Sequence, residues 1–189
     1  DCDGLRLFVR SDPIKVRRQN NHLESIDPVT GHRKGKVDLE GGGYLLPDNP
    51  PSPIDSLEEA KQRCKQAEAD YSDEKMQLLK QARARVPQRF VASSPLGMTM
   101  NTYTTLRGRE QAMMDLFDRP GFVAAVIDIQ VETAIRQAEK LFATAIDGLF
   151  IGDATSSASL ISPQHFERFC LPAYQKFCRH FANHDVLIY

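Results

Sequence analysis

The sequence predicts an α/β fold in which parallel strands alternate with helices. In the second half of the chain, short apolar runs of strand length alternate with stretches of helical periodicity. These runs are apolar on both faces, as parallel strands covered by helices must be. The chain has 189 residues, of which 41% are apolar and 26% charged, the balance of a globular domain with one core.

The first quarter of the chain carries strand and turn patterns. Residues 3–9 (DGLRLFV) are expected to form a strand. Two alternating segments within 22–40 flank the turn sequence DPVTG (27–31), which predicts a β-hairpin. The run of glycines at 41–43 reads as a turn, because no Lys-Ser/Thr follows it as a phosphate-binding loop requires. PDNPPSP (47–53) reads as a stiff connector.

Two helices are predicted after this connector. SLEE (56–59) is a capping box. In it the Ser56 hydroxyl accepts a hydrogen bond from the backbone amide of Glu59, and the Glu59 carboxylate accepts one from the backbone amide of Ser56. It predicts a helix to about residue 70. A serine followed by two acids starts the second helix, over 72–85, and Pro87 stops it.

The second half is expected to continue with β/α units. RFVAS (89–93) predicts a buried strand that ends in a loop, Ser94–Gly97. A short helix is expected over 107–117. A long helix follows over 120–144, where apolar residues recur at near-helical spacing, and LFI (149–151) is the next strand.

The last predicted helix begins at Ser162, with Pro163 at its first position, where a missing N–H costs nothing. Pro172 is expected to bend it. Its apolar stripe should face a sheet. The stripe consists of Phe166, Phe169, Cys170, Ala173, Phe177 and Phe181.

A final strand is predicted over 185–189. A strand with nothing after it is a poor way to end a fold, and β/α barrels usually have about 250 residues. We therefore expect part of a TIM (β/α)8 barrel, truncated at both ends. The strand edges left open by such a truncation would invite self-association.

Composition excludes several classes of partner. The net charge of −1 favours neither nucleic acid nor an anionic membrane as a partner. No apolar run approaches the ~18–20 residues of a membrane span, and no leader is visible. Because the chain begins without methionine, the sequence leaves open whether a leader or another segment precedes Asp1.

The four cysteines, Cys2, Cys64, Cys170 and Cys178, form no C-x-x-C pair and no usual zinc spacing with histidine. This scatter indicates reduced thiols in a cytoplasmic protein. Cys170 falls on the apolar face of the last helix, so we expect it to be a small buried hydrophobic residue.

The stretch DGLFIGDATSSASLISP (147–163) places polar side chains at the end of a strand. In a β/α barrel the carboxyl ends of the strands carry the chemistry. Asp153 lies just beyond the strand, Ser156 and Ser157 follow, and the next helix contributes unpaired N–H groups. We therefore expect a polar pocket with Asp153 as its acid. The alternative is that Asp153 only organises its loop.

Two other strand ends carry related residues. Asp12 follows the strand at 3–9, and Met98 and Tyr103 follow the strand at 89–93. A tyrosine there can donate to a carboxylate, or it can be a capped core aromatic.

The run at 147–177, together with SPLGMTMNTYTTLRG (94–108), resembles the uroporphyrinogen decarboxylase superfamily. In that family an apolar strand, an acid, a small-residue loop and Ser-Pro-x-x-Phe-x-x-Phe-x-x-Pro recur in this order, as in SPQHFERFCLP here. The resemblance is specific across 87–189 and looser across 1–86. It implies a TIM barrel with its cleft at the strand carboxyl ends, and residues 14–54 as an irregular hairpin insertion beside the cleft.

The resemblance implies one of two chemistries. One branch consists of lyases of porphyrin biosynthesis, which decarboxylate tetrapyrrole acetate side chains without a cofactor. The other consists of zinc-dependent methyltransferases, such as methylcobalamin:coenzyme M methyltransferases, which move a methyl group between a corrinoid protein and a thiol or similar acceptor. The loop GDATSSASLISP (152–163) resembles the methyltransferase branch more closely.

For the methyltransferase branch, the resemblance implies that Asp153 and the serine loop shape the substrate pocket. Tyr103, Asp12 and Met98 would line the same cleft. The branch carries His-x-Cys directly after a strand like 185–189, and another cysteine later. We therefore expect the zinc ligands beyond Tyr189, and not among the four cysteines.

The decarboxylase branch is the alternative. Tyr103 matches its substrate-contacting tyrosine, Asp12 the aspartate that holds the pyrrole N–H groups, and Ser156 or Ser157 a serine of the later loop. Leu96, however, stands where that branch has an aromatic residue. A third hypothesis is that the chain as given is an inactive half-barrel.

Overall fold

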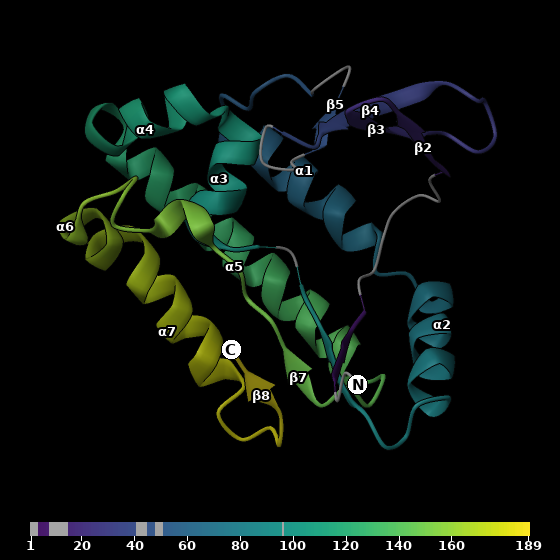
Figure 1. Ribbon diagram of the computed structural model, residues 1–189. Helices are drawn as coiled ribbons and strands as arrows, with labels where there is room; N and C mark the ends of the chain where they lie inside the picture. Colours follow the sequence, from purple (N-terminus) through teal and green to yellow (C-terminus); the bar gives the residue numbers. More distant parts are fainter. Residues whose placement is uncertain (1–3, 8–14, 41–44, 48–50, 96) are drawn as a thin grey trace. The chain divides into compact units, whose positions relative to one another are not determined.

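Two sheets, one parallel and one antiparallel, organise the protein in the computed structural model (Figure 1). The structure describes residues 4–7, 15–40, 45–47, 51–95 and 97–189. The chain divides into two units, Arg10–Ser52 and the remainder, Asp1–Val9 with Pro53–Tyr189. Each sheet belongs to one of these units. No helix of the described residues is long and apolar enough to cross a membrane.

The larger unit is built on the parallel sheet. In spatial order its strands are β1 (Gly4–Arg6), β6 (Phe90–Ser93), β7 (Gly148–Leu149) and β8 (Leu187–Ile188). All three neighbouring pairs are parallel. Because spatial order follows chain order and helices lie between successive strands, this is a series of β/α units. The carboxyl ends of the strands therefore lie at one edge of the sheet.

The helices of this unit begin where the sequence provides caps. They are α1 (Leu57–Ala69), α2 (Asp73–Ala84), α3 (Thr99–Arg107), α4 (Arg109–Asp118), α5 (Pro120–Phe142), α6 (Pro163–His165) and α7 (Leu171–His180), with a 3-10 turn η1 (Ala154–Ser156) and a π-helical turn η2 (Phe166–Cys170). The predicted capping box is confirmed: Ser56 Oγ accepts from the Glu59 amide at 3.2 Å, and the Glu59 carboxylate accepts from the Ser56 amide at 3.1 Å.

The helix predicted over 107–117 is confirmed as α4 (Arg109–Asp118), whose ends differ from the prediction by one or two residues. The prediction missed a separate helix directly before it, α3 (Thr99–Arg107). They meet at Gly108, whose φ of 83° lies in the region that favours glycine. Threonine and asparagine are weak helix formers and mask α3 in the sequence, whereas burial of its Met100 stabilises the helix in the fold.

Helix α5 is the centre of the packing. It contacts α1, α3, α4 and α7, and Figure 1 shows it running between α1 and α7. The apolar stripe of the last helix packs against α5, where it contributes Phe169, Cys170, Ala173, Phe177 and Phe181 to the core. Pro172 is the second residue of α7, just past the π-helical turn, and it cannot donate the hydrogen bond of a regular helix.

The smaller unit is an antiparallel sheet in chain order. Its strands are β2 (Lys15–Gln19), β3 (His22–Ile26), β4 (Arg33–Asp38) and β5 (Leu45–Pro47). Between β3 and β4, Asp27 Oδ1 accepts from the amides of Val29 and Thr30 at 2.8 and 3.0 Å. This side chain closes the turn that connects the two strands.

Candidate functional site

The candidate site is an open pocket at the carboxyl ends of β7 and β8, with a volume of about 420 Å³. Its walls come from the loop after β7, from η2 and α7, and from the end of β8. The residues that line it are Ile151, Asp153, Ser156, Ser157, Phe166, Tyr174, Cys178, Ile188 and Tyr189. The carboxyl edge of a parallel sheet is where β/α folds position their chemistry.

Asp153 is the centre of a hydrogen-bond cluster in this pocket. Its Oδ2 accepts from the Tyr174 hydroxyl at 2.7 Å and from Ser156 Oγ at 2.5 Å. The Thr99 hydroxyl also donates to Oδ2. The amide of Asn101 donates to Oδ1 at 3.0 Å. Three hydroxyls and one backbone amide therefore fix the orientation of this carboxylate.

The cluster joins segments that are distant in the chain. Thr99 begins α3 after β6, Asp153 and Ser156 follow β7, and Tyr174 lies on α7. Thr99 has a φ of 61°, which β-branched residues rarely adopt. Such backbone strain persists only where surrounding contacts over-determine it, and it is concentrated at functional sites. Here the strained residue is one of the three hydroxyl donors to Asp153.

The surroundings raise the pKa of both Tyr174 and Asp153. Burial raises the pKa of Asp153, and hydrogen bonds from Ser156, Tyr174 and Asn101 offset only part of this rise. Burial also raises the pKa of Tyr174, and the neighbouring carboxylate adds to the effect. Tyr174 therefore serves as a hydrogen-bond donor at neutral pH.

One residue of the predicted site, Ser157, and one predicted core residue, Cys170, lie at the margin of the pocket. Ser157 lines the pocket, but its Oγ is exposed and pairs with Ser159 Oγ at 2.8 Å. Cys170 is fully buried, as expected, and burial raises the pKa of its thiol. Its Sγ lies 3.3 Å from Ser156 Oγ, so this core residue also supports the cluster from behind.

The expectation that Tyr103 lines the same cleft is wrong. Tyr103 is fully buried, and its hydroxyl donates to Asp115 Oδ2 at 2.7 Å. Arg107 Nε donates to the same oxygen at 2.7 Å. Because α3 forms a helix here, it turns this tyrosine into the core of the unit instead of the pocket.

The other two sequence candidates have different outcomes. Met98 is fully buried in the hydrophobic core, so the expectation that it contacts substrate is wrong. Asp12 lies outside the residues that the structure describes.

Sequence reasoning missed Thr99, Asn101 and Tyr174. Thr99 and Asn101 stand between the predicted loop, Ser94–Gly97, and Tyr103, and no local pattern ranks them above their neighbours. Tyr174 gives a weak signal, because it follows Ala173 at the edge of the apolar stripe and carries a polar head. Only the packing of α7 onto the loop after β7 shows where that head points.

The described residues do not fit a zinc ion. No group of three or more His, Cys, Asp or Glu side chains among them could hold a metal. Cys64 is buried on α1, Cys170 is buried behind Ser156, and Cys178 is exposed on α7. We therefore assign no zinc-dependent step to these residues.

The chain is similar to one protein family and to a solved structure. Residues 36–189 match the family model described as uroporphyrinogen decarboxylase (URO-D). A solved structure, a methyltransferase from Methanosarcina mazei, is similar with a TM-score of 0.54 and 19% sequence identity. The match covers 99% of this chain and 51% of that chain, so the chain spans about half the length of that protein. At this identity the likeness concerns the fold. No curated protein matches the sequence.

Proposed function

The chain belongs to the uroporphyrinogen decarboxylase family, and from that membership we propose that it is part of a methyltransferase. In this proposal the whole enzyme moves a methyl group between a corrinoid protein and a thiol or similar acceptor. The pocket at the ends of β7 and β8 receives the acceptor or the methyl donor. The methyltransferase fold of the solved neighbour supports this choice within the family.

The observation that carries the proposal is the chemistry of the pocket lining. It contains one carboxylate, hydroxyl groups and aromatic rings, and none of its nine described residues is lysine or arginine. A tetrapyrrole with several carboxylates requires cationic partners when it is desolvated. This lining therefore suits a ligand without such carboxylates, which supports methyl transfer over decarboxylation.

Asp153 has the central role in this proposal. Its carboxylate accepts a hydrogen bond from the bound ligand, while the hydroxyls of Thr99, Ser156 and Tyr174 act as positioning residues. A hydrogen bond to a charged group is worth about 1.5–3 kcal/mol. That energy is available to orient the ligand because the carboxylate is already fixed before the ligand binds.

Zinc would supply activation of an acceptor thiol as thiolate in such an enzyme. From the family resemblance we expect its ligands to follow the strand that contains β8. The described residues of this chain would contribute ligand orientation and exclusion of water, not coordination.

The test uses the full-length product of the gene in two assays. With free methylcobalamin and a small thiol, we expect formation of the methyl thioether, measured by mass spectrometry. With uroporphyrinogen, we expect no release of carbon dioxide. Decarboxylation without methyl transfer would reverse the proposal, and failure of both reactions in a folded protein would favour the inactive alternative.

A further inference from the structure

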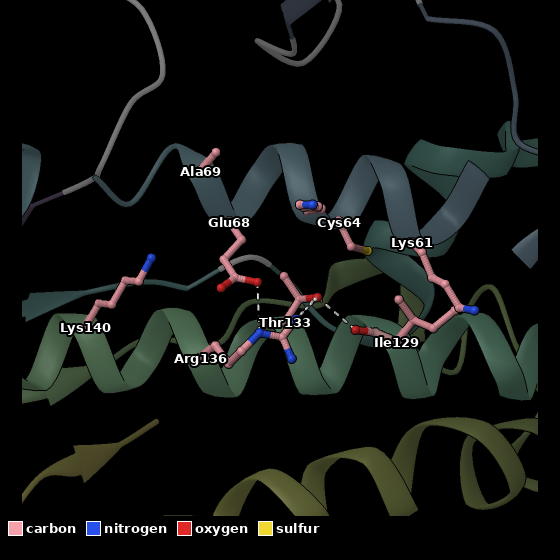
Figure 2. A pocket seen from close by; sticks show the side chains of 9 residues that line it. Lys61, Cys64, Glu68, Ala69, Ile129, Thr133, Arg136 and Lys140 are labelled. Atoms are coloured by element: carbon pink, nitrogen blue, oxygen red, sulfur yellow. Dashed lines mark hydrogen bonds and ion pairs between the residues drawn. The ribbon is translucent and has the colours of Figure 1, made fainter. Parts of the chain in front are cut away.

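A second pocket lies between α1 and α5, away from the candidate site. It is an open groove with a volume of about 420 Å³, and it shares no residue with the pocket around Asp153. We call it the α1/α5 groove. Its lining residues are Lys61, Cys64, Lys65, Glu68, Ala69, Ile129, Thr133, Arg136 and Lys140. Figure 2 shows Cys64 and Glu68 pointing from one helix toward the other, and Thr133 pointing back.

The rim of the groove is strongly cationic. Arg136 Nε pairs with Glu68 Oε2 at 2.8 Å, which neutralises the one acid of the lining. Three lysines are left. Lys61 has only a 3.8 Å contact with the exposed Glu58, and Lys65 and Lys140 form no ion pair with any described residue. Lys61 and Lys140 stand at opposite ends of the groove (Figure 2).

The floor of the groove is apolar. Cys64 is 2% exposed, and burial raises the pKa of its thiol, which therefore stays uncharged. Thr133 is also buried, and its hydroxyl donates to the Ile129 carbonyl at 2.9 Å, which satisfies its polar atom within the helix. Because both side chains are buried, the surface offered between the lysines comes from the half-buried Ile129 and from the methylene stems of the charged side chains.

We propose that the α1/α5 groove is a binding site for a small organic anion with an apolar body, such as an aromatic or aliphatic carboxylate or sulfonate. The apolar body covers the surface at Ile129, and the anionic head pairs with Lys65 or Lys140, the lysines without an ion pair to any described residue. The volume lies within the ~300–1,000 Å³ of small-molecule sites. An inorganic phosphate would use the rim but leave the floor in water, so it fits the lining less well.

The probe for the test is 1-anilinonaphthalene-8-sulfonate, whose fluorescence rises on transfer to an apolar site. We expect saturable binding to the full chain that weakens as salt is raised. The neutral analogue N-phenyl-1-naphthylamine, which keeps the rings and lacks the sulfonate, should bind at least about tenfold more weakly, a difference of about 1.4 kcal/mol.

The decisive variant is Lys65→Glu/Lys140→Glu, which reverses both lysines that lack ion pairs. We expect its affinity for the sulfonate probe to fall about tenfold or more. The matched control is Lys80→Glu/Arg109→Glu, which makes the same change in net charge at two exposed positions outside the groove. Circular dichroism and urea unfolding check that both variants are folded.

Three results would overturn the proposal. They are equal loss of affinity in the groove variant and its control, equal affinity for the neutral and the anionic probe, and no saturable binding to the unmodified chain. The last result would mean that the lysines are solvated surface residues or that they bind an acidic macromolecule. None of these results depends on methyl transfer, so the two proposals fail independently.

Discussion

The hydroxyl of Tyr174 donates a 2.7 Å hydrogen bond to Asp153 Oδ2 and so links α7 to the loop after β7. Because the tyrosine comes from a helix that packs on α5, the position of the carboxylate depends on the core of the unit. Burial raises the pKa of Asp153 despite this bond. The site therefore holds an acid at a cost to stability, which is the pattern expected of a functional group.

Asp153→Asn should separate activity from stability. A raised folded-state pKa means that the folded protein loses stability as pH rises from the ordinary value of 3.8 through the folded pKa. An uncharged asparagine avoids this loss, so urea unfolding at pH 7 should show equal or higher stability. Methyl transfer by the full-length protein should fall about 10–100-fold.

The opposite pattern would assign Asp153 to loop organisation. If the asparagine variant loses stability and activity in the same proportion, the carboxylate only holds its loop. Asp147→Asn is a control of a different kind, because Asp147 pairs with Arg83 at 3.2 Å and accepts from the Val91 amide at 2.7 Å. That variant should lose stability.

Tyr174→Phe should lower activity with little loss of stability. The ring stays packed near Phe166, at a centroid distance of 6.2 Å, and the hydroxyl loses its hydrogen bond to Asp153 and its 3.2 Å contact with Thr99 Oγ1. Two other hydroxyls, those of Thr99 and Ser156, still hold Oδ2. We expect a fall in kcat/KM of about tenfold, and an unchanged rate would remove Tyr174 from the positioning residues.

Tyr103→Phe should lower the stability of the protein with little effect on its activity. Its hydroxyl serves Asp115, which is fully buried. Burial raises the pKa of Asp115, but hydrogen bonds from Arg107, Tyr103 and Gln111 outweigh burial and bring the pKa below its usual value. Loss of one such bond should reduce the free energy of unfolding by about 1–3 kcal/mol. A loss of methyl transfer without loss of stability would contradict this structural role and indicate that Tyr103 contacts the substrate.

Asp27 should give the antiparallel unit a pH-dependent turn. Backbone hydrogen bonds from Thr30 and Val29, with help from Lys34, lower the pKa of Asp27 from 3.8 to about 2. A lowered folded-state pKa gives stability that is present above 3.8 and is lost as pH falls through about 2. A carboxyl-carbon NMR titration checks this value. An inflection at or above 3.8 would contradict the turn geometry.

Much of the secondary structure follows from local sequence signals. The capping box at Ser56–Glu59 and the Ser162-Pro163 start each act within one turn of chain, so the sequence alone is sufficient to place them. The α/β class follows likewise from periodicity. Local signals do not predict helix α3, because its residues have low helix propensity and it is stabilised by burial of its side chains in the core.

The sequence by itself determined the family pattern and placed Asp153 at a strand end, because both are properties of adjacent residues. Only the tertiary structure decided which hydroxyls reach that carboxylate. It brought Thr99 and Tyr174 to Asp153 and turned Tyr103 and Met98 into the core. The physical reason is that side-chain direction along a helix depends on which face the surrounding elements bury, and that face is set by contacts between residues far apart in the chain.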